Sequence, residues 1–167
     1  MMNEIIEEIL TSSDKTKVFK KHNIIFAYML KDAWSHPLRV VYVTSDKENN
    51  LHLIKELNDE IISTIDVEEL NMALSNHAEK FDESKKIELP PVMVMDGYIN
   101  EVWFKANDSW HNDSIDNMYY YDGKDFDENE HLFEVIGLLD DVYEVLYKNN
   151  KVIEEYFILC EPEDMEE

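Results

Sequence analysis

The chain has 167 residues, 44% of them hydrophobic, and this length suits one ordinary hydrophobic core rather than two. Its 38 acidic and 15 basic residues give a formal net charge of −23, which opposes direct binding to nucleic acid or to an anionic membrane, because both interactions depend on Lys and Arg. The single cysteine, Cys160, cannot form an internal disulfide, so the sequence favours a reducing compartment, and we expect the cytoplasm.

The N-terminal part predicts one short helix followed by two strands. Ile5, Ile6 and Ile9 share one side of a helix over residues 3–10. Residues 23–30 and 38–44 are rich in β-branched and aromatic side chains, which is typical of strands, and we expect the two to pair antiparallel. The acidic start and the short apolar runs predict neither a signal peptide nor a membrane-spanning segment.

Two consecutive helices are predicted in the middle of the chain. The first covers residues 48–64, because apolar residues recur there at spacings of three and four. These residues are Leu51, Ile54, Leu57, Ile61 and Ile65. The second helix begins after Asp66, which forms a capping box with Glu69, and its apolar face extends to Phe81.

The region after the second helix contains strand and turn signals. Residues 92–95 and 98–104 predict a β-hairpin joined by Asp96 and Gly97. Residues 105–117 are expected to form a polar loop whose Trp110 is anchored in the core, and residues 118–126 to form a second small hairpin.

A long amphipathic helix is predicted over residues 128–148, followed by a strand over residues 151–159. The order of elements favours an α+β fold with a mainly antiparallel sheet and helices packed largely on one face. We expect a single domain over residues 1–160 and an acidic C-terminal tail over residues 161–167. No stretch carries a motif specific to a known family.

Recognisable catalytic and cofactor motifs are missing from the sequence. Three glycines cannot build a phosphate-binding loop, and the acidic run over residues 122–130 fits no register of a calcium-binding loop. His111 with Asp113 could act as a metal ligand or a general base, but no second His or Cys in suitable spacing supports that chemistry. We therefore expect no catalytic residue, no metal and no cofactor, and a function other than catalysis.

The charge is concentrated toward the C-terminus. Residues 1–105 have a net charge of −7 and residues 106–167 a net charge of −16, and between Ala106 and Tyr147 the only base is Lys124. The carboxylates of the helix over 128–148 are expected on the face opposite its apolar stripe. The net charge of −23 is larger in magnitude than the value of about 2 to 8 that keeps a small domain soluble. The excess negative charge lowers the stability of the fold, because like charges repel one another.

A cationic partner would relieve that repulsion. The sequence therefore predicts an inhibitor of immunity, antitoxin or nucleic-acid-mimic type, which binds a basic toxin, nuclease or other nucleic-acid-binding protein. The alternatives are a general protein-interaction adaptor of phage or mobile-element origin and, third, an enzyme with an unrecognised site. The expected partner-binding residues are Asp108, Trp110, Asp113, Asp116, Tyr119, Tyr120, Tyr121, Asp122, Asp125, Asp127, Glu128, Glu130, Glu134, Asp140, Asp141 and Glu144.

Overall fold

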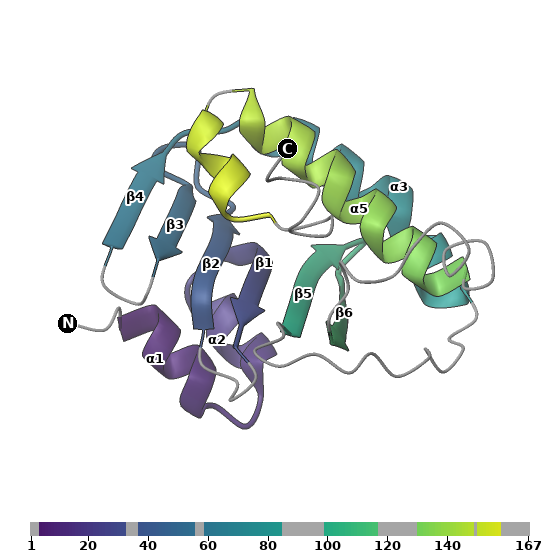
Figure 1. Ribbon diagram of the computed structural model, residues 1–167, viewed down its shortest axis with the longest axis horizontal. Coiled ribbons are helices and arrows are strands. Elements are labelled where there is room, and N and C mark those ends of the chain that lie inside the picture. Colours follow the sequence, from purple (N-terminus) through teal and green to yellow (C-terminus); the bar gives the residue numbers. More distant parts are fainter. Residues whose placement is uncertain are drawn as a thin grey trace, which may run out of the picture.

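The fold is α+β, as the sequence predicted, and it is built around one antiparallel sheet (Figure 1). The computed structural model describes residues 4–32, 37–55, 59–84, 99–116, 130–148 and 150–157. The helices in these ranges are α1 (Glu4–Thr11), α2 (Lys15–Lys21), α3 (Val67–Glu83), α5 (Glu130–Tyr147) and the 3-10 helix η2 (Lys151–Glu155). The strands are β1 (Ile24–Lys31), β2 (Pro37–Thr44), β3 (Leu51–Lys55), β4 (Asp59–Ser63), β5 (Ile99–Ala106) and β6 (Ser109–Asp116).

The strands lie in the order β4-β3-β2-β1-β5-β6, and every neighbouring pair is antiparallel. The predicted pairing of the first two strands is confirmed, with Tyr28 opposite Val41. After β4 the chain continues through α3 and returns to the other side of β1 as β5. Strand β1 is therefore central and has almost no exposed residues, which explains its nearly continuous apolar sequence.

Helices cover both faces of the sheet. The long helices α3 and α5 pack with η2 on one face, where Tyr28, Leu53 and Phe104 belong to the larger core cluster. The shorter helices α1 and α2 cover the other face, where Met29 and Ile54 belong to a second cluster. Figure 1 shows α3 and α5 side by side, away from α1 and α2. The prediction that helices lie largely on one face thus describes the two long helices, and α1 with α2 adds a third layer.

The predicted helix over residues 48–64 is wrong, because this segment forms the hairpin of β3 and β4. Leu51 and Leu53 point to one face of the sheet and Ile54 to the other, so an apolar pattern with helical spacing is satisfied by a strand buried on both faces. Asn49 adopts a positive φ of 51° just before β3 and helps the chain to turn there.

The predicted loop over residues 105–117 is also wrong. Residues Asn107 and Asp108 have φ values of 53° and 63°, which suit the two central residues of a tight hairpin turn, and β6 follows directly. Strand β6 is polar because it lies at the edge of the sheet, where one side of the strand meets solvent.

The strand predicted over residues 151–159 is replaced by η2 within the described range. The Asn150 side chain accepts a hydrogen bond from the backbone N–H of Val152 and so caps this 3-10 helix. Ile153 and Tyr156 are buried at a spacing of three, which matches 3-10 geometry. The predicted turn at residues 96–97, the hairpin over 118–126 and the tail over 161–167 lie outside the described residues.

Candidate functional site

Acidic residues gather on the layer formed by α3 and α5, which we call the acidic layer. The two helices run antiparallel, because Glu69 near the start of α3 pairs with Lys148 at the end of α5, whereas Ser84 after α3 contacts His131 in the first turn of α5. Helix α3 holds five acids and one base, and α5 holds five acids and no base, for net charges of −4 and −5. On the other face of the sheet, α1 holds three acids and α2 four lysines, for a net charge of +1.

Six carboxylates of the acidic layer are exposed and form no ion pair with any described residue. They are Glu68, Glu79 and Glu83 of α3 and Glu130, Asp140 and Glu144 of α5. The three from α5 were among the expected partner-binding residues. The three from α3 were not, because the sequence shows the charge of α3 but not that α3 lies beside α5.

The sequence placed Glu134 and Asp141 on the outer face of α5, but both contact α3, and only Asp141 remains largely exposed, at 55%. The ring of His77 lies between them, with Nε2 at 2.5 Å from an Asp141 oxygen and Nδ1 at 3.8 Å from a Glu134 oxygen. The Glu134 side chain is 14% exposed. Gly137 of α5 lies beside this ring, and a Cβ there would make an ordinary contact of 3.7 Å with Cε1 of His77. These carboxylates therefore join the two helices.

A buried polar chain connects α3, α5 and β6. The Ser84 hydroxyl donates to the Phe81 carbonyl at 3.0 Å and lies 2.7 Å from Nδ1 of His131, whose Nε2 is hydrogen-bonded to Asp113. His131 is thus buried in the first turn of α5. The order Ser–His–Asp resembles that of a catalytic triad, but the Ser84 hydroxyl is buried and already engaged at the end of α3. The chain fixes the three elements relative to one another.

His111 of β6 makes a second link to α3. Its Nδ1 lies 2.8 Å from an Asp82 oxygen, and its ring stacks on Phe104 at 4.9 Å. His111 and Asp113 lie on the same side of the strand, and His111 contacts Asp82 of α3 whereas Asp113 contacts His131 of α5. Asp113 therefore contributes to the packing of β6 against α5 and is not an exposed carboxylate of the acidic layer.

Trp110 is separated from the acidic layer by the sheet. Its ring packs against Phe19 of α2, with the centroids 4.9 Å apart, and it belongs to the core cluster under α1 and α2. The expected anchoring of Trp110 in a core is confirmed, although a strand and not a loop carries it. Trp110 therefore cannot serve as an aromatic anchor beside the carboxylates of α5. Asp108 is exposed in the turn between β5 and β6.

Several expected partner-binding residues lie outside the described part of the chain. They are Tyr119, Tyr120, Tyr121, Asp122, Asp125, Asp127 and Glu128. Asp116 is the last residue of β6 and lies opposite Ile99 of β5. The described part of the site is thus the surface of α3 and α5.

Two large apolar side chains, which the sequence did not single out, are exposed on the acidic layer. Phe133 of α5 is 60% exposed and Met72 of α3 is 68% exposed. Phe133 follows Glu130 by three residues and precedes Asp140 by seven, so all three share the outer face of α5. This spacing was present in the sequence, but Phe133 falls inside a strongly apolar helix and its exposure is visible only in the structure.

A shallow groove of about 280 Å³ separates the outer surfaces of α3 and α5. Met72, Asp141 and Glu144 line it, and the ion pair of Glu69 with Lys148 borders it. The hydrogen bond and the negative charge of Glu69 raise the pKa of Lys148. The acidic layer thus combines exposed carboxylates, a groove and exposed apolar side chains.

Neither a search for metal sites nor a comparison with known proteins assigns a function to the chain. Among the described residues, no group of three or more His, Cys, Asp or Glu side chains is arranged to hold a metal ion. In the same ranges, no helix has both the length and the apolar composition needed to cross a membrane. Protein-family models, curated proteins and solved structures give no match to the chain.

Proposed function

We propose that this chain is a non-enzymatic cytoplasmic binding protein that inhibits a basic nucleic-acid-binding protein or nuclease, in the manner of an immunity protein, an antitoxin or a nucleic-acid mimic. The observation that carries the proposal is the uneven charge of the two helical layers. The acidic layer sums to −9, whereas α1 and α2 sum to +1. Solubility benefits from net charge but does not require one sign to gather on one face.

The antiparallel packing of α3 and α5 gives two rows of carboxylates instead of the single row considered from sequence. Each row follows a helix, and helices in contact lie about 8–10 Å apart. Such a surface attracts a basic groove over a distance and raises the rate of association, as charged clefts and complementary patches do. The attraction is strongest toward a protein whose own groove is built to hold phosphates.

The exposed apolar residues can contribute binding affinity, which exposed charges contribute only weakly. Phe133 lies on the same face as the carboxylates, and an aromatic side chain that becomes buried on binding often carries much of the affinity. We therefore assign the carboxylates mainly to the rate of association and Phe133 to the lifetime of the complex. The two groups are expected to respond differently to substitution.

The test uses the partner that copurifies with the protein from its native host, once it is identified, in kinetic binding at about 50 and 300 mM salt. The variant Glu130→Gln, Asp140→Asn, Glu144→Gln should slow association at low salt by about tenfold, within the range of 10 to 1,000 that steering supplies, and should flatten its salt dependence. The matched control is Glu7→Gln, Asp46→Asn, Glu48→Gln, which removes the same charge from exposed positions outside the acidic layer.

Phe133→Ala should raise the dissociation rate by about fivefold or more, the effect of losing roughly 1 kcal/mol at an interface. Ile62→Ala, on the edge strand β4, provides the control for an exposed apolar residue elsewhere. Double-stranded DNA should compete with the protein for the partner. Equal effects of the two triple variants, or simultaneous binding of DNA and protein, would refute the inhibitor; binding of many unrelated proteins would favour the adaptor.

A further inference from the structure

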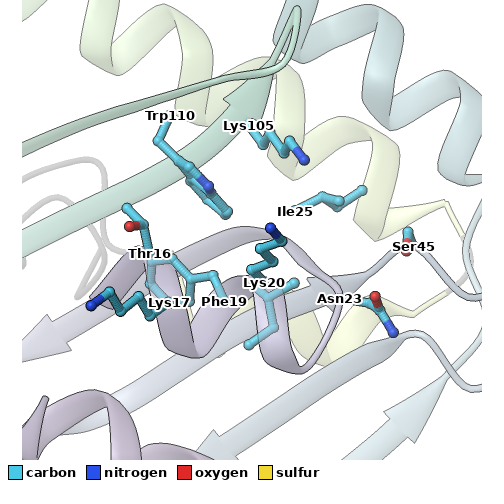
Figure 2. A pocket seen from close by; sticks show the side chains of 10 residues that line it. Thr16, Lys17, Phe19, Lys20, Asn23, Ile25, Ser45, Lys105 and Trp110 are labelled. Carbon is cyan, nitrogen blue, oxygen red and sulfur yellow. The ribbon is translucent and has the colours of Figure 1, made fainter. Parts of the chain in front are cut away.

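A cavity of about 520 Å³ lies beside α2, at the end of the sheet where β1 and β6 begin (Figure 2). This volume is within the range of about 300–1,000 Å³ that is usual for small-molecule sites. Its lining comes from α2, from the turn between α2 and β1, from β1, from the end of β2 and from the β5–β6 hairpin. The lining residues include Thr16, Lys17, Lys20, Asn23, Lys105 and Trp110.

The cavity is basic in a strongly acidic protein. Three of its ten lining residues are lysines and none is acidic, although the whole chain has 38 acids and 15 bases. Figure 2 shows the amines of Lys20 and Lys105 extending into the same space, while Lys17 points away from it. An anion held there would relieve the mutual repulsion of the two amines.

Two of the other three lysines of α2 have an ion-pair partner. Lys15 pairs with Glu101 at 3.5 Å, and Lys21 pairs with Glu8 at 3.1 Å. Lys20 and Lys105, by comparison, form no ion pair with any residue in the described ranges. Lys17 has no ion pair in these ranges either, but it points away, so Lys20 and Lys105 are the unpaired amines that extend into the cavity.

One wall of the cavity is a fixed aromatic ring. The indole of Trp110 borders the space beside the two amines (Figure 2). Phe19 supports it from below, and Phe19 is itself fully buried and packed edge-on against Trp103 at 5.5 Å. A half-buried indole beside a cavity offers a surface on which a flat ring can stack.

The far end of the cavity carries polar groups on a fixed backbone. Asn23 adopts a positive φ of 57°, and its carbonyl accepts a hydrogen bond of 2.8 Å from the N–H of Ser45. The side chains of Asn23 and Ser45 both line the cavity. They add an amide and a hydroxyl that can bond to a polar ligand.

We propose that this cavity binds a small phosphorylated ligand with a flat ring, of the nucleotide class. Lys20 and Lys105 contact the phosphate, and Trp110 stacks on the ring. Among the described residues, no acidic side chain lines the cavity, and at about 0.1 M salt charges more than ~10 Å apart are largely screened, so the lining lysines dominate the charge felt by a bound anion. The proposal does not depend on the function assigned to the acidic layer.

The test is titration of the isotopically labelled protein with AMP, with inorganic phosphate and with adenosine at about 0.1 M salt, followed by NMR. The indole N–H signal of Trp110 is assigned by its loss in Trp110→Phe. AMP should shift this signal and bind more tightly than either phosphate or adenosine, because AMP alone carries both the phosphate and the ring. Lys20→Gln with Lys105→Gln should weaken AMP binding by about tenfold or more, since hydrogen bonds to charged groups are stronger than neutral ones.

The matched control is Lys47→Gln with Lys80→Gln, which removes two exposed lysines that do not line the cavity. It should leave the dissociation constant for AMP within about twofold of the wild type, since an exposed lysine that does not contact the ligand is screened by water and salt. Three results would overturn the proposal: no shift of the Trp110 signal at ~10 mM AMP, equal weakening by the two double variants, or equal affinity for AMP and phosphate. Equal affinity for AMP and phosphate would mean that the site does not recognise a flat ring.

Discussion

Glu101→Gln tests a charge cluster that joins β5 to β1 and to α2. Glu101 of β5 lies 2.9 Å from Nζ of Lys31 on β1 and 3.5 Å from Nζ of Lys15 on α2. The indole N–H of Trp103 donates to the same carboxylate at 3.0 Å. Since α2 carries Lys20, the position of this helix also determines the shape of the lysine-lined cavity.

The expected cost follows from the exposure of the three charges. The side chains of Glu101 and Lys31 are only 12% and 10% exposed, so their hydrogen bond is charge-assisted and poorly screened, worth about 1.5–3 kcal/mol. Lys15 is 24% exposed and adds less, about 0.5 kcal/mol. Glutamine keeps one oxygen for Trp103 and leaves Lys31 without a counter-charge. We expect a loss of about 2–3 kcal/mol in the free energy of unfolding, or roughly 4–12 °C in Tm for a chain of this size.

The loss should depend on pH with a definite sign. Burial opposes ionisation of Glu101, but the hydrogen bond and charge of Lys31, together with Lys15 and Trp103, outweigh it and lower the pKa of this carboxyl. Its contribution is therefore present above the unfolded pKa of about 4.3 and disappears as the pH falls through the lower folded value. Urea unfolding at low protein concentration should show a constant difference between wild type and variant from pH 7 to 5, and a smaller one below pH 4.

A double-mutant cycle with Lys31→Gln checks the cause. If the two side chains interact, the double variant should lose clearly less stability than the sum of the single variants. Glu79→Gln, at an exposed site on α3, is the control and should change stability by less than about 0.5 kcal/mol. Additive losses, or a loss at pH 7 no larger than that of Glu79→Gln, would refute the reasoning.

Two further predictions concern local backbone structure and can be checked by the same urea unfolding. Asp66→Ala should cost about 1 kcal/mol, because the Asp66 side chain accepts a hydrogen bond of 3.1 Å from the N–H of Glu69 at the start of α3; Asp46→Ala, in the exposed connection between β2 and β3, should cost less than half as much. Asp108→Ala should cost about 1 kcal/mol more than Asp108→Gly, because the φ of 63° at this residue is unfavourable for alanine and open to glycine. Equal stability of these two variants would contradict the turn geometry.

Local signals in the sequence were sufficient for the elements that are stabilised within themselves. The capping box of Asp66 and Glu69 placed the start of α3, and the apolar stripe from Leu132 to Leu146 placed α5. The run of β-branched and aromatic residues from Ile24 to Leu30 placed β1. In each case the residues that form the helix or strand also carry the sequence signal that predicts it.

The sequence was insufficient where the same pattern suits two structures. Leu51 and Ile54 are three residues apart and fit one side of a helix, but they also fit opposite faces of a strand that is buried on both sides. Only the pairing of β3 with β2, which places Leu53 opposite Val41, decides between the two. The polar strand β6 was missed for a related reason, because an edge strand need not be apolar.

The excess of acidic residues was a property of the sequence, and its distribution in space was a property of the fold. The sequence assigned the charge to the C-terminal part of the chain, including Glu134 and Asp141. Antiparallel packing of α3 against α5 turned these two toward His77 and brought Glu68, Glu79 and Glu83 to the exposed surface beside α5. The fold also brought Lys20 of α2 and Lys105 of β5, which are far apart in the sequence, to one cavity at the end of the sheet.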